Sequence, residues 1–299
     1  MVTGTVLERV GSSYRILTAD GEVRAVLRGK MKRQAPKVVV GDRVRLDLDG
    51  VHGILGIAAV LERTSLLARR VPEGRGVRPV AANVDQVLVV AATRHPDPIP
   101  QLLDRLLVIA EANHLPAGVV LNKVDLDPGE ALAERFLKAG YPVYRVSVTR
   151  DVGLEPLRDR LTGRETVITG PSGAGKSSLL NALEPGLRLR TGTVSRRIGR
   201  GVNTTVSAVM VPLGDGGFLV DTPGFSEVGL WGLAPRELAA CFPEFRPLID
   251  RCRFPDCSHT HEPKCAVLQA VAGGQVAADR HASYAALLAE LKGIPKAWE

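Results

Sequence analysis

The order of its motifs constrains the fold of this chain more than any other feature of the sequence. Residues 170–177 read Gly-Pro-Ser-Gly-Ala-Gly-Lys-Ser, the spacing of a P-loop, whose backbone N–H groups surround phosphates. A P-loop usually opens its domain. Here residues 122–125, Asn-Lys-Val-Asp, come well before it, and residues 221–224, Asp-Thr-Pro-Gly, come after it. The fold must therefore bring the parts of one nucleotide site together in a rotated chain order.

From about residue 77 the hydrophobic pattern alternates between buried strands and amphipathic helices. Such alternation predicts a mostly parallel sheet covered by helices on both faces, with its functional loops at the carboxyl ends of the strands. Asn122, Ser147, Gly170 and Asp221 all stand at predicted strand ends. The predicted strands are 87–90, 119–121, 143–146, 166–169 and 218–220, and the predicted helices are 98–113, 130–139 and 178–183.

The tetrapeptide at 122–125 indicates which base the site binds. The Asp125 carboxylate can accept two hydrogen bonds, which matches the N1–H and 2-amino donors of guanine and offers adenine nothing suitable. This disfavours an ATP-dependent kinase. We expect Lys123 to pack along the base, Asn122 to tie this loop to the P-loop, and Ser147 to support the guanine. The predicted guanine-nucleotide contacts are Asn122, Lys123, Val124, Asp125, Ser147, Gly170, Pro171, Ser172, Gly173, Ala174, Gly175, Lys176, Ser177 and Ser178.

The sequence around residues 203 and 221 predicts how Mg²⁺ and the γ-phosphate are held. We expect Asp221 to reach Mg²⁺ through water and the Gly224 amide to contact the γ-phosphate. Thr204 is favoured as the metal-binding hydroxyl, with Thr205 as the alternative, although both could simply begin the next strand. Phe225 cannot orient water as a glutamine would, so slow intrinsic hydrolysis is predicted. The predicted catalytic set is Lys176, Ser177, Thr204, Asp221, Gly224 and Asn203, of which Asn203 cannot act as a base.

The N-terminal quarter reads as a small basic β-barrel. Its short strands, separated by turn signals, favour a five-stranded barrel of the OB type. Residues 1–76 carry 14 Lys/Arg and 8 Asp/Glu, so they hold most of the net charge of +7. The loop at 28–34 is rich in these cations and could lie along an RNA backbone, although a solvated surface is the alternative. The predicted strands are 5–7, 13–17, 23–27, 44–48 and 54–57.

A cluster of cysteines and histidines near the C-terminus predicts a metal site. Cys252, Cys257, His259 and Cys265 form the three-thiolate, one-imidazole set that favours a closed tetrahedral Zn²⁺, and such a site stabilises a fold rather than catalysing. His261 is an alternative fourth ligand, and His259 is preferred. We expect Cys241 to be an ordinary buried residue, and we expect helices over 235–242 and 277–291.

Taken together, these residues closely resemble the bacterial ribosome small-subunit-dependent GTPases, over essentially the whole chain. The resemblance rests on residues 82–85, 121–126, 170–179 and 221–225 and on the cluster at 252–265. It implies an OB barrel that contacts 16S ribosomal RNA, GTP hydrolysis stimulated by the 30S subunit, and one structural zinc. The switch loop of the family usually reads Gly-x-His-Thr-Thr, whereas Asn203 stands here in place of the histidine.

The predicted architecture is an α/β chain with an N-terminal OB-type barrel (1–72), a circularly permuted P-loop GTPase domain (77–230) and a helical zinc-binding domain (231–299). The expected ligands are GTP or GDP, Mg²⁺ and one Zn²⁺. No signal peptide or long apolar run is evident, so we expect a cytoplasmic protein without a membrane partner. We also expect a monomer without a DNA partner. Because Asn203 and Phe225 weaken the catalytic prediction, an RNA-binding assembly factor that senses nucleotide but hydrolyses it poorly is the alternative.

Overall fold

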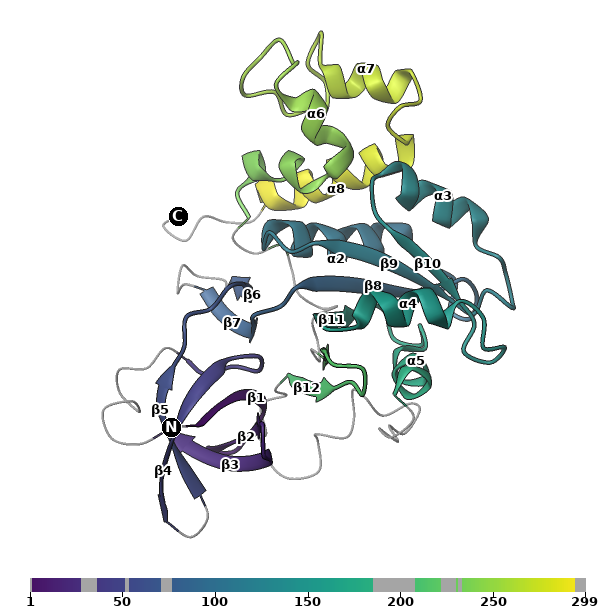
Figure 1. Ribbon diagram of the computed structural model, residues 1–299. Coiled ribbons are helices and arrows are strands. Elements are labelled where there is room, and N and C mark those ends of the chain that lie inside the picture. Colours follow the sequence, from purple (N-terminus) through teal and green to yellow (C-terminus); the bar gives the residue numbers. More distant parts are fainter. Residues whose placement is uncertain are drawn as a thin grey trace.

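Parallel strands form the centre of the computed structural model (Figure 1). The structure describes residues 2–27, 37–51, 54–70, 77–184, 208–221, 230 and 233–293, without the side chains of 48–51, 69, 70, 77 and 78. The central strands lie in the order β10-β9-β8-β11-β13-β12, and all are parallel except β12. Their bounds are β8 Gln86–Ala92, β9 Ala117–Asn122, β10 Val143–Val146, β11 Glu165–Thr169, β12 Val209–Pro212 and β13 Phe218–Asp221.

Helices cover both faces of this sheet, as the alternating pattern predicts. Val87 and Val89 of β8 pack into the same core as α2 (Pro100–Ala112) and α3 (Glu130–Lys138). Leu88 and Val90 face the other way, into a core shared with α4 (Leu154–Leu161) and α5 (Lys176–Leu183). All seven residues of β8 are buried, which is typical of a central parallel strand.

The five-stranded barrel predicted at the N-terminus is confirmed. Its strands follow the order β1-β2-β3-β5-β4, and pairing of β1 with β4 closes it. Val6, Ile16, Val44, Leu46 and Ile57 fill its interior. The strand bounds are β1 Val2–Val10, β2 Ser13–Thr18, β3 Gly21–Leu27, β4 Arg43–Val51 and β5 Ile54–Val60.

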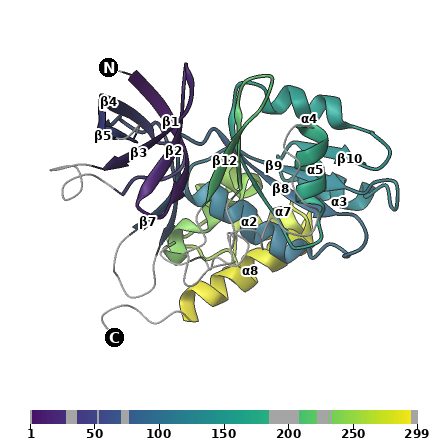
Figure 2. The same cartoon turned by 90° about the horizontal axis from the view of Figure 1, so that it is seen from below.

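Strand β12 joins the barrel to the central sheet. It pairs with β13 and also with β1, where Glu8 lies opposite Val209, so one sheet continues from β10 into the barrel (Figure 2). A hairpin of β6 (Leu66–Arg70) and β7 (Val77–Ala82) lies between these parts in the chain. The Asn83 side chain donates to Gly41 O (2.7 Å) and accepts from Thr64 N (2.9 Å), which fixes the chain after this hairpin. Because the sheet is continuous, the domain boundaries at 72, 77 and 230 stay predictions.

The C-terminal helices pack against α2 (Figure 1). The predicted helix at 277–291 corresponds to α8 (Ala278–Gly293). The predicted single helix over 235–242 is wrong, because two short 3₁₀ turns stand there. Phe242 precedes Pro243 and is extended (φ −110°, ψ 102°), since a proline ring disfavours the helical conformation at the preceding residue. The remaining elements are η4 Pro235–Glu237, η5 Ala239–Cys241, η6 Pro243–Phe245, α6 Arg246–Ile249 and α7 Ala266–Ala272.

Buried charged side chains join the C-terminal helices to α2 and α3. Asp104 on α2 is fully buried and accepts two hydrogen bonds from Arg135 (2.8 and 2.6 Å) and one from Arg280 on α8 (2.7 Å). Arg280 also donates to Glu244 (2.6 and 3.0 Å), and its guanidinium lies 4.6 Å from the centroid of the Phe242 ring. Burial alone would raise the pKa of Asp104, but the two arginines hold that pKa below its usual value. This cluster therefore depends on every member being present.

We expect Arg280→Met to lower the free energy of unfolding of the zinc-loaded protein by about 3 kcal/mol or more, because it leaves buried Glu244 and Asp104 short of a partner. Arg246→Met is the matched control, since Arg246 pairs with Glu111 but its side chain is 49% exposed, against 1% for Arg280. The control should lose less than about 1 kcal/mol. Urea denaturation measures both losses, and equal losses would contradict a special role for the buried cluster.

Candidate functional site

Four of the predicted site residues meet at one edge of the central sheet. Asn122 and Asp221 end strands β9 and β13, and Gly170 and Ser147 directly follow β11 and β10. The strand register places Asp221 beside Ile168, two residues before the P-loop, and Asn122 beside Val146. The rotated motif order is thus compatible with a single site, because parallel strands end at the same edge whatever their order in the chain.

The P-loop leads from β11 into the N-terminus of α5. Gly170, Gly173 and Gly175 have positive φ angles of 144°, 80° and 86°. A Cβ at Gly175 would overlap the Asn122 side chain, so glycine is needed there for space as well as for conformation. Ser177 and Ser178 lie half-buried in the first turn of α5, and the free amides of a helix N-terminus favour an anion.

Lys176 begins α5, and its charge lies in this loop. Its Nζ donates to Gly170 O (2.7 Å) and Pro171 O (2.8 Å). Burial lowers the pKa of Lys176, and the charge of Asp221 opposes that shift. Burial likewise raises the pKa of Asp221 to about 6, and here Lys176 opposes the shift. The Lys176 ammonium and the Asp221 carboxylate thus lie close enough at this edge of the sheet for each to influence the pKa of the other.

Hydrogen bonds tie the loop at 122–125 to the P-loop. The Asn122 side chain donates to Ala174 O (3.0 Å) and accepts from the Lys123 amide (2.8 Å). The Lys123 ammonium donates to Gly173 O (3.0 Å) and to the carbonyl of His95, which follows β8. Sequence reasoning predicted the Asn122 link but missed His95, whose place after a central strand was the available signal.

Asp125 projects from this loop as an exposed carboxylate. Ser147 Oγ donates to its Oδ1, and Thr149 Oγ1 donates to its Oδ2 (3.2 Å). The hydrogen bond from Ser147 holds the pKa of Asp125 below its usual value, so the group is an ionised acceptor at neutral pH. The Val124 amide donates to Val146 O (3.2 Å), which keeps the loop close to β10. An ionised carboxylate presented in this way suits the paired donors of guanine.

The structure also brings together Cys252, Cys257, His259 and Cys265, whose ligand atoms all lie within 4.8 Å of one another. His259 Nδ1 lies 3.5 Å from the sulfurs of both Cys252 and Cys265, and those two sulfurs are 3.8 Å apart. Zinc bonds to sulfur are about 2.3 Å long and zinc bonds to nitrogen about 2.0–2.1 Å. In a tetrahedral site these lengths place a nitrogen about 3.5 Å from a sulfur, and two sulfurs about 3.8 Å apart. The donor set and its spacing therefore fit zinc.

The other histidine and cysteine considered as ligands, His261 and Cys241, lie outside this cluster. His261 is exposed, and its Nδ1 lies 3.0 Å from Thr260 Oγ1 rather than near the sulfurs. Cys241 is buried elsewhere, and burial raises its pKa to about 12, so its thiol stays neutral. The His259 carbonyl accepts from His281 Nε2 (2.7 Å), which anchors the loop to α8.

Comparison with known proteins agrees with this geometry. The model of the RsgA GTPase family matches residues 60–231. The chain is 51% identical to the small ribosomal subunit biogenesis GTPase RsgA of Gemmatimonas aurantiaca, over 97% of this chain and 98% of the relative. The chain belongs to the RsgA GTPase family. It is 40% identical to the protein of the same name from Moorella thermoacetica, over 96% and 97% of the two chains.

Solved structures related to the RsgA GTPase family share the whole fold. The crystal structure of YjeQ from Thermotoga maritima superposes with a TM-score of 0.80 at 35% identity, covering 98% of this chain and 99% of that one. YloQ, described as a circularly permuted GTPase, superposes with a TM-score of 0.77 at 28% identity, covering 99% and 97%. The circular permutation and the GTPase activity predicted from the motif order are thereby confirmed.

Part of the predicted RsgA-family site lies outside the described residues. Asn203, Thr204, Thr205, Gly224 and Phe225 all fall there. So does the whole of the basic loop predicted at 28–34, with its flanking residues up to 36. The roles predicted for these residues stay predictions.

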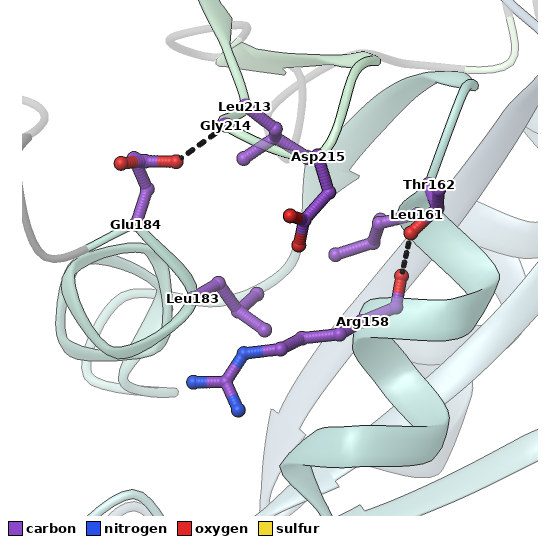
Figure 3. Close-up of a pocket in the computed structure, with 8 residues that line it drawn as sticks. All are labelled: Arg158, Leu161, Thr162, Leu183, Glu184, Leu213, Gly214 and Asp215. Atoms are coloured by element: carbon purple, nitrogen blue, oxygen red, sulfur yellow. Dashed lines mark hydrogen bonds between the residues drawn. The ribbon is translucent and has the colours of Figure 1, made fainter.

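A shallow pocket lies away from the nucleotide edge, between α4, α5 and the β12–β13 turn (Figure 3). Arg158 lines it and donates to Ala182 O (2.8 Å), and Glu184 accepts from the Gly214 amide (2.8 Å). Its polar groups thus serve to join α5 to the neighbouring elements, and the pocket contains none of the predicted site residues. Among the described residues, no helix has the length and apolarity needed to cross a membrane.

Proposed function

We propose that this GTPase acts in biogenesis of the small ribosomal subunit, binding the 30S particle and hydrolysing GTP there. The names of its relatives supply the partner. The supporting observation in this chain is the hydrogen bond from Asn122 to Ala174 O, because it joins the guanine-selecting loop to the phosphate-binding loop. One nucleotide can therefore contact both.

The residues predicted from the sequence are assigned as follows. Asp125 selects guanine, with Ser147 and the Lys123 stem supporting the base. Lys176 and the amides of the P-loop bind the β- and γ-phosphates. This assignment is supported by the ionised state of Asp125 and by the position of Lys176 at the start of α5.

The donor set at this edge also suits a hard cation such as Mg²⁺. Ser177 and Asp221 are the described residues that would hold it, with Thr204 from the part of the chain that is not described. When bound, Mg²⁺ neutralises charge on the phosphate oxygens. Burial of Asp221 limits its solvation, which favours an interaction with a nearby cation.

The attacking water needs an orienting group that the sequence does not supply in the usual form. Phe225 follows Gly224, and Asn203 can donate and accept hydrogen bonds but cannot take a proton. We therefore assign stimulation of hydrolysis to the bound particle, which would supply or position the group that orients the water.

The flanking parts supply the contacts with the particle. The excess of cations in residues 1–76 supports binding of the barrel to the 16S RNA backbone. The fit of the Cys252–Cys265 cluster to tetrahedral zinc supports one structural Zn²⁺ in the C-terminal part. We place the protein in the cytoplasm as a monomer without a DNA partner, as the sequence predicts.

We expect purified small subunits to increase GTP turnover at least about tenfold, which corresponds to about 1.4 kcal/mol of barrier. Phosphate release is measured with and without 30S particles, and large subunits serve as the control for non-specific RNA. Nucleotide-dependent binding to 30S without any stimulated turnover would instead favour the second candidate, a nucleotide-sensing RNA-binding assembly factor. That candidate draws support from Asn203 and Phe225.

A further inference from the structure

The Asp125 carboxylate is held by two hydroxyl groups, one at each oxygen. Ser147 is buried and its hydroxyl contacts Oδ1, whereas Thr149 is exposed and its hydroxyl contacts Oδ2 at 3.2 Å. The two hydroxyls also lie 3.1 Å from each other. Nothing in the motif at 122–125 required a second hydroxyl, so the function of Thr149 needs its own explanation.

Counting protons assigns the direction of these hydrogen bonds. Each hydroxyl has one proton to donate. The proton of Ser147 is used by Asp125, and Ser147 Oγ already accepts from the Arg150 amide (3.2 Å). The stronger remaining acceptor for Thr149 is the charged Oδ2 rather than the Ser147 hydroxyl. Each carboxylate oxygen thus accepts one hydroxyl proton, and the backbone N–H of Asp125 itself also interacts with the carboxylate.

This arrangement leaves one acceptor position free on each oxygen. An ionised carboxylate has about four lone-pair positions, two on each oxygen. Two are used by Ser147 and Thr149, and guanine brings two donors, N1–H and the 2-amino group. The carboxylate can therefore satisfy both the loop and the base, provided that its plane does not rotate.

The turn that carries Thr149 is closed and cannot easily move away. Ser147 and Val152 exchange two backbone hydrogen bonds, at 2.9 and 3.0 Å, across this turn. Gly153 follows with φ 70°, and a Cβ there would overlap Arg145 O. Thr149 is thus presented to Asp125 by a backbone whose course is fixed on both sides.

We propose that Thr149 is a positioning residue for guanine selection, which stops the Asp125 carboxylate from rotating about its Cβ–Cγ bond. With the Ser147 bond alone, only one of the two oxygens would oppose this rotation, and the carboxylate would lose the plane that two-point recognition requires. This inference rests on the proposed role of Asp125 and adds a second determinant of specificity to it.

The test compares GDP with IDP, which lacks the 2-amino group, by calorimetric titration of the full-length zinc-loaded protein. Thr149→Val should weaken GDP binding by about three- to tenfold, the range for one hydrogen bond. IDP binding should weaken by less, so that the ratio of GDP affinity to IDP affinity falls. Thr149→Ser should restore the wild-type ratio. Thr162→Val is the matched control, because that exposed threonine bonds only the Arg158 carbonyl among the described residues and lies away from the site.

A double-mutant cycle with Asp125→Ala separates the possible outcomes. If Asp125→Ala leaves GDP affinity unchanged, the proposed site fails and this inference fails with it. If Asp125→Ala weakens binding but Thr149→Val leaves the GDP-to-IDP preference intact, only the inference is overturned. If Thr149→Val weakens the binding of GDP and IDP equally, and does so in the Asp125→Ala background as well, Thr149 only stabilises the loop and the inference is overturned. Support requires that its effect vanish in the Asp125→Ala background.

Discussion

Replacing Lys176 with alanine is expected to weaken GTP binding by about two orders of magnitude or more and to abolish turnover, even with small subunits present. The reason is geometric as well as electrostatic. The ammonium already lies in the P-loop, within 2.8 Å of two carbonyl oxygens, and a charged phosphate oxygen is a stronger acceptor than either. Titration with a fluorescent GTP analogue measures the loss.

Lys138→Ala is the control for this substitution. Lys138 lies on α3, pairs with Glu134 four residues earlier, and is 62% exposed, so its removal changes net charge equally without touching the site. GTP affinity should not change in that variant. Wild-type affinity in Lys176→Ala, with an unchanged circular dichroism spectrum, would show that the triphosphate does not bind at this loop.

Loss of the metal is expected to unfold the loop at 252–265 and the helices packed on it. If the cluster holds the proposed zinc ion, Cys265→Ser should abolish zinc binding and lower the stability of the C-terminal part by at least about 5 kcal/mol. Cys265 is 2% exposed, and its sulfur accepts from the Leu268 amide (3.5 Å) at the start of α7. A serine hydroxyl can still accept that bond as an N-cap, so the replacement removes the predicted metal ligand and leaves the start of the helix capped.

Zinc content, limited proteolysis and urea denaturation together test this expectation. Cys241→Ser is the matched control, because Cys241 is also buried but lies outside the cluster, and this variant should keep its zinc. The wild-type protein, which keeps Cys265, should release zinc in proportion to the number of its thiols that a mercurial reagent blocks. A metal-free protein with the stability and protease resistance of the zinc-loaded form would rule out a structural metal.

Much of the fold could be predicted from local patterns. Strands such as Val143–Val146 and helices such as Glu130–Lys138 carry a clear hydrophobic period and begin or end at turn residues. The helix at Leu154–Leu161 was missed although its buried leucines have helical spacing, because the segment is short and follows a polar turn. Such patterns predict a helix or strand well when the hydrophobic spacing and the turn residues lie within that segment itself.

Features formed by distant residues could not be predicted in this way. Asp104 lies in a helix whose other buried positions are apolar, and its partners Arg135 and Arg280 are 31 and 176 residues further along the chain. No local period distinguishes such a carboxylate from a solvated one. The same holds for the hydrogen bonds of Thr149 to Asp125 and of Lys123 to the His95 carbonyl, which form only because β8, β9 and β10 lie side by side.

The position of β12 has a mechanical consequence for the whole molecule. Val209 is the register partner of Asp221 on one side and of Glu8 on the other. Main-chain pairing thus connects the end of β13, beside the strand that leads into the P-loop, to the first strand of the barrel through a single intervening strand. A shift of Asp221 along its strand would be carried to the barrel as a tilt. We therefore expect the angle between the barrel and the central sheet to differ between the GTP-bound and GDP-bound states.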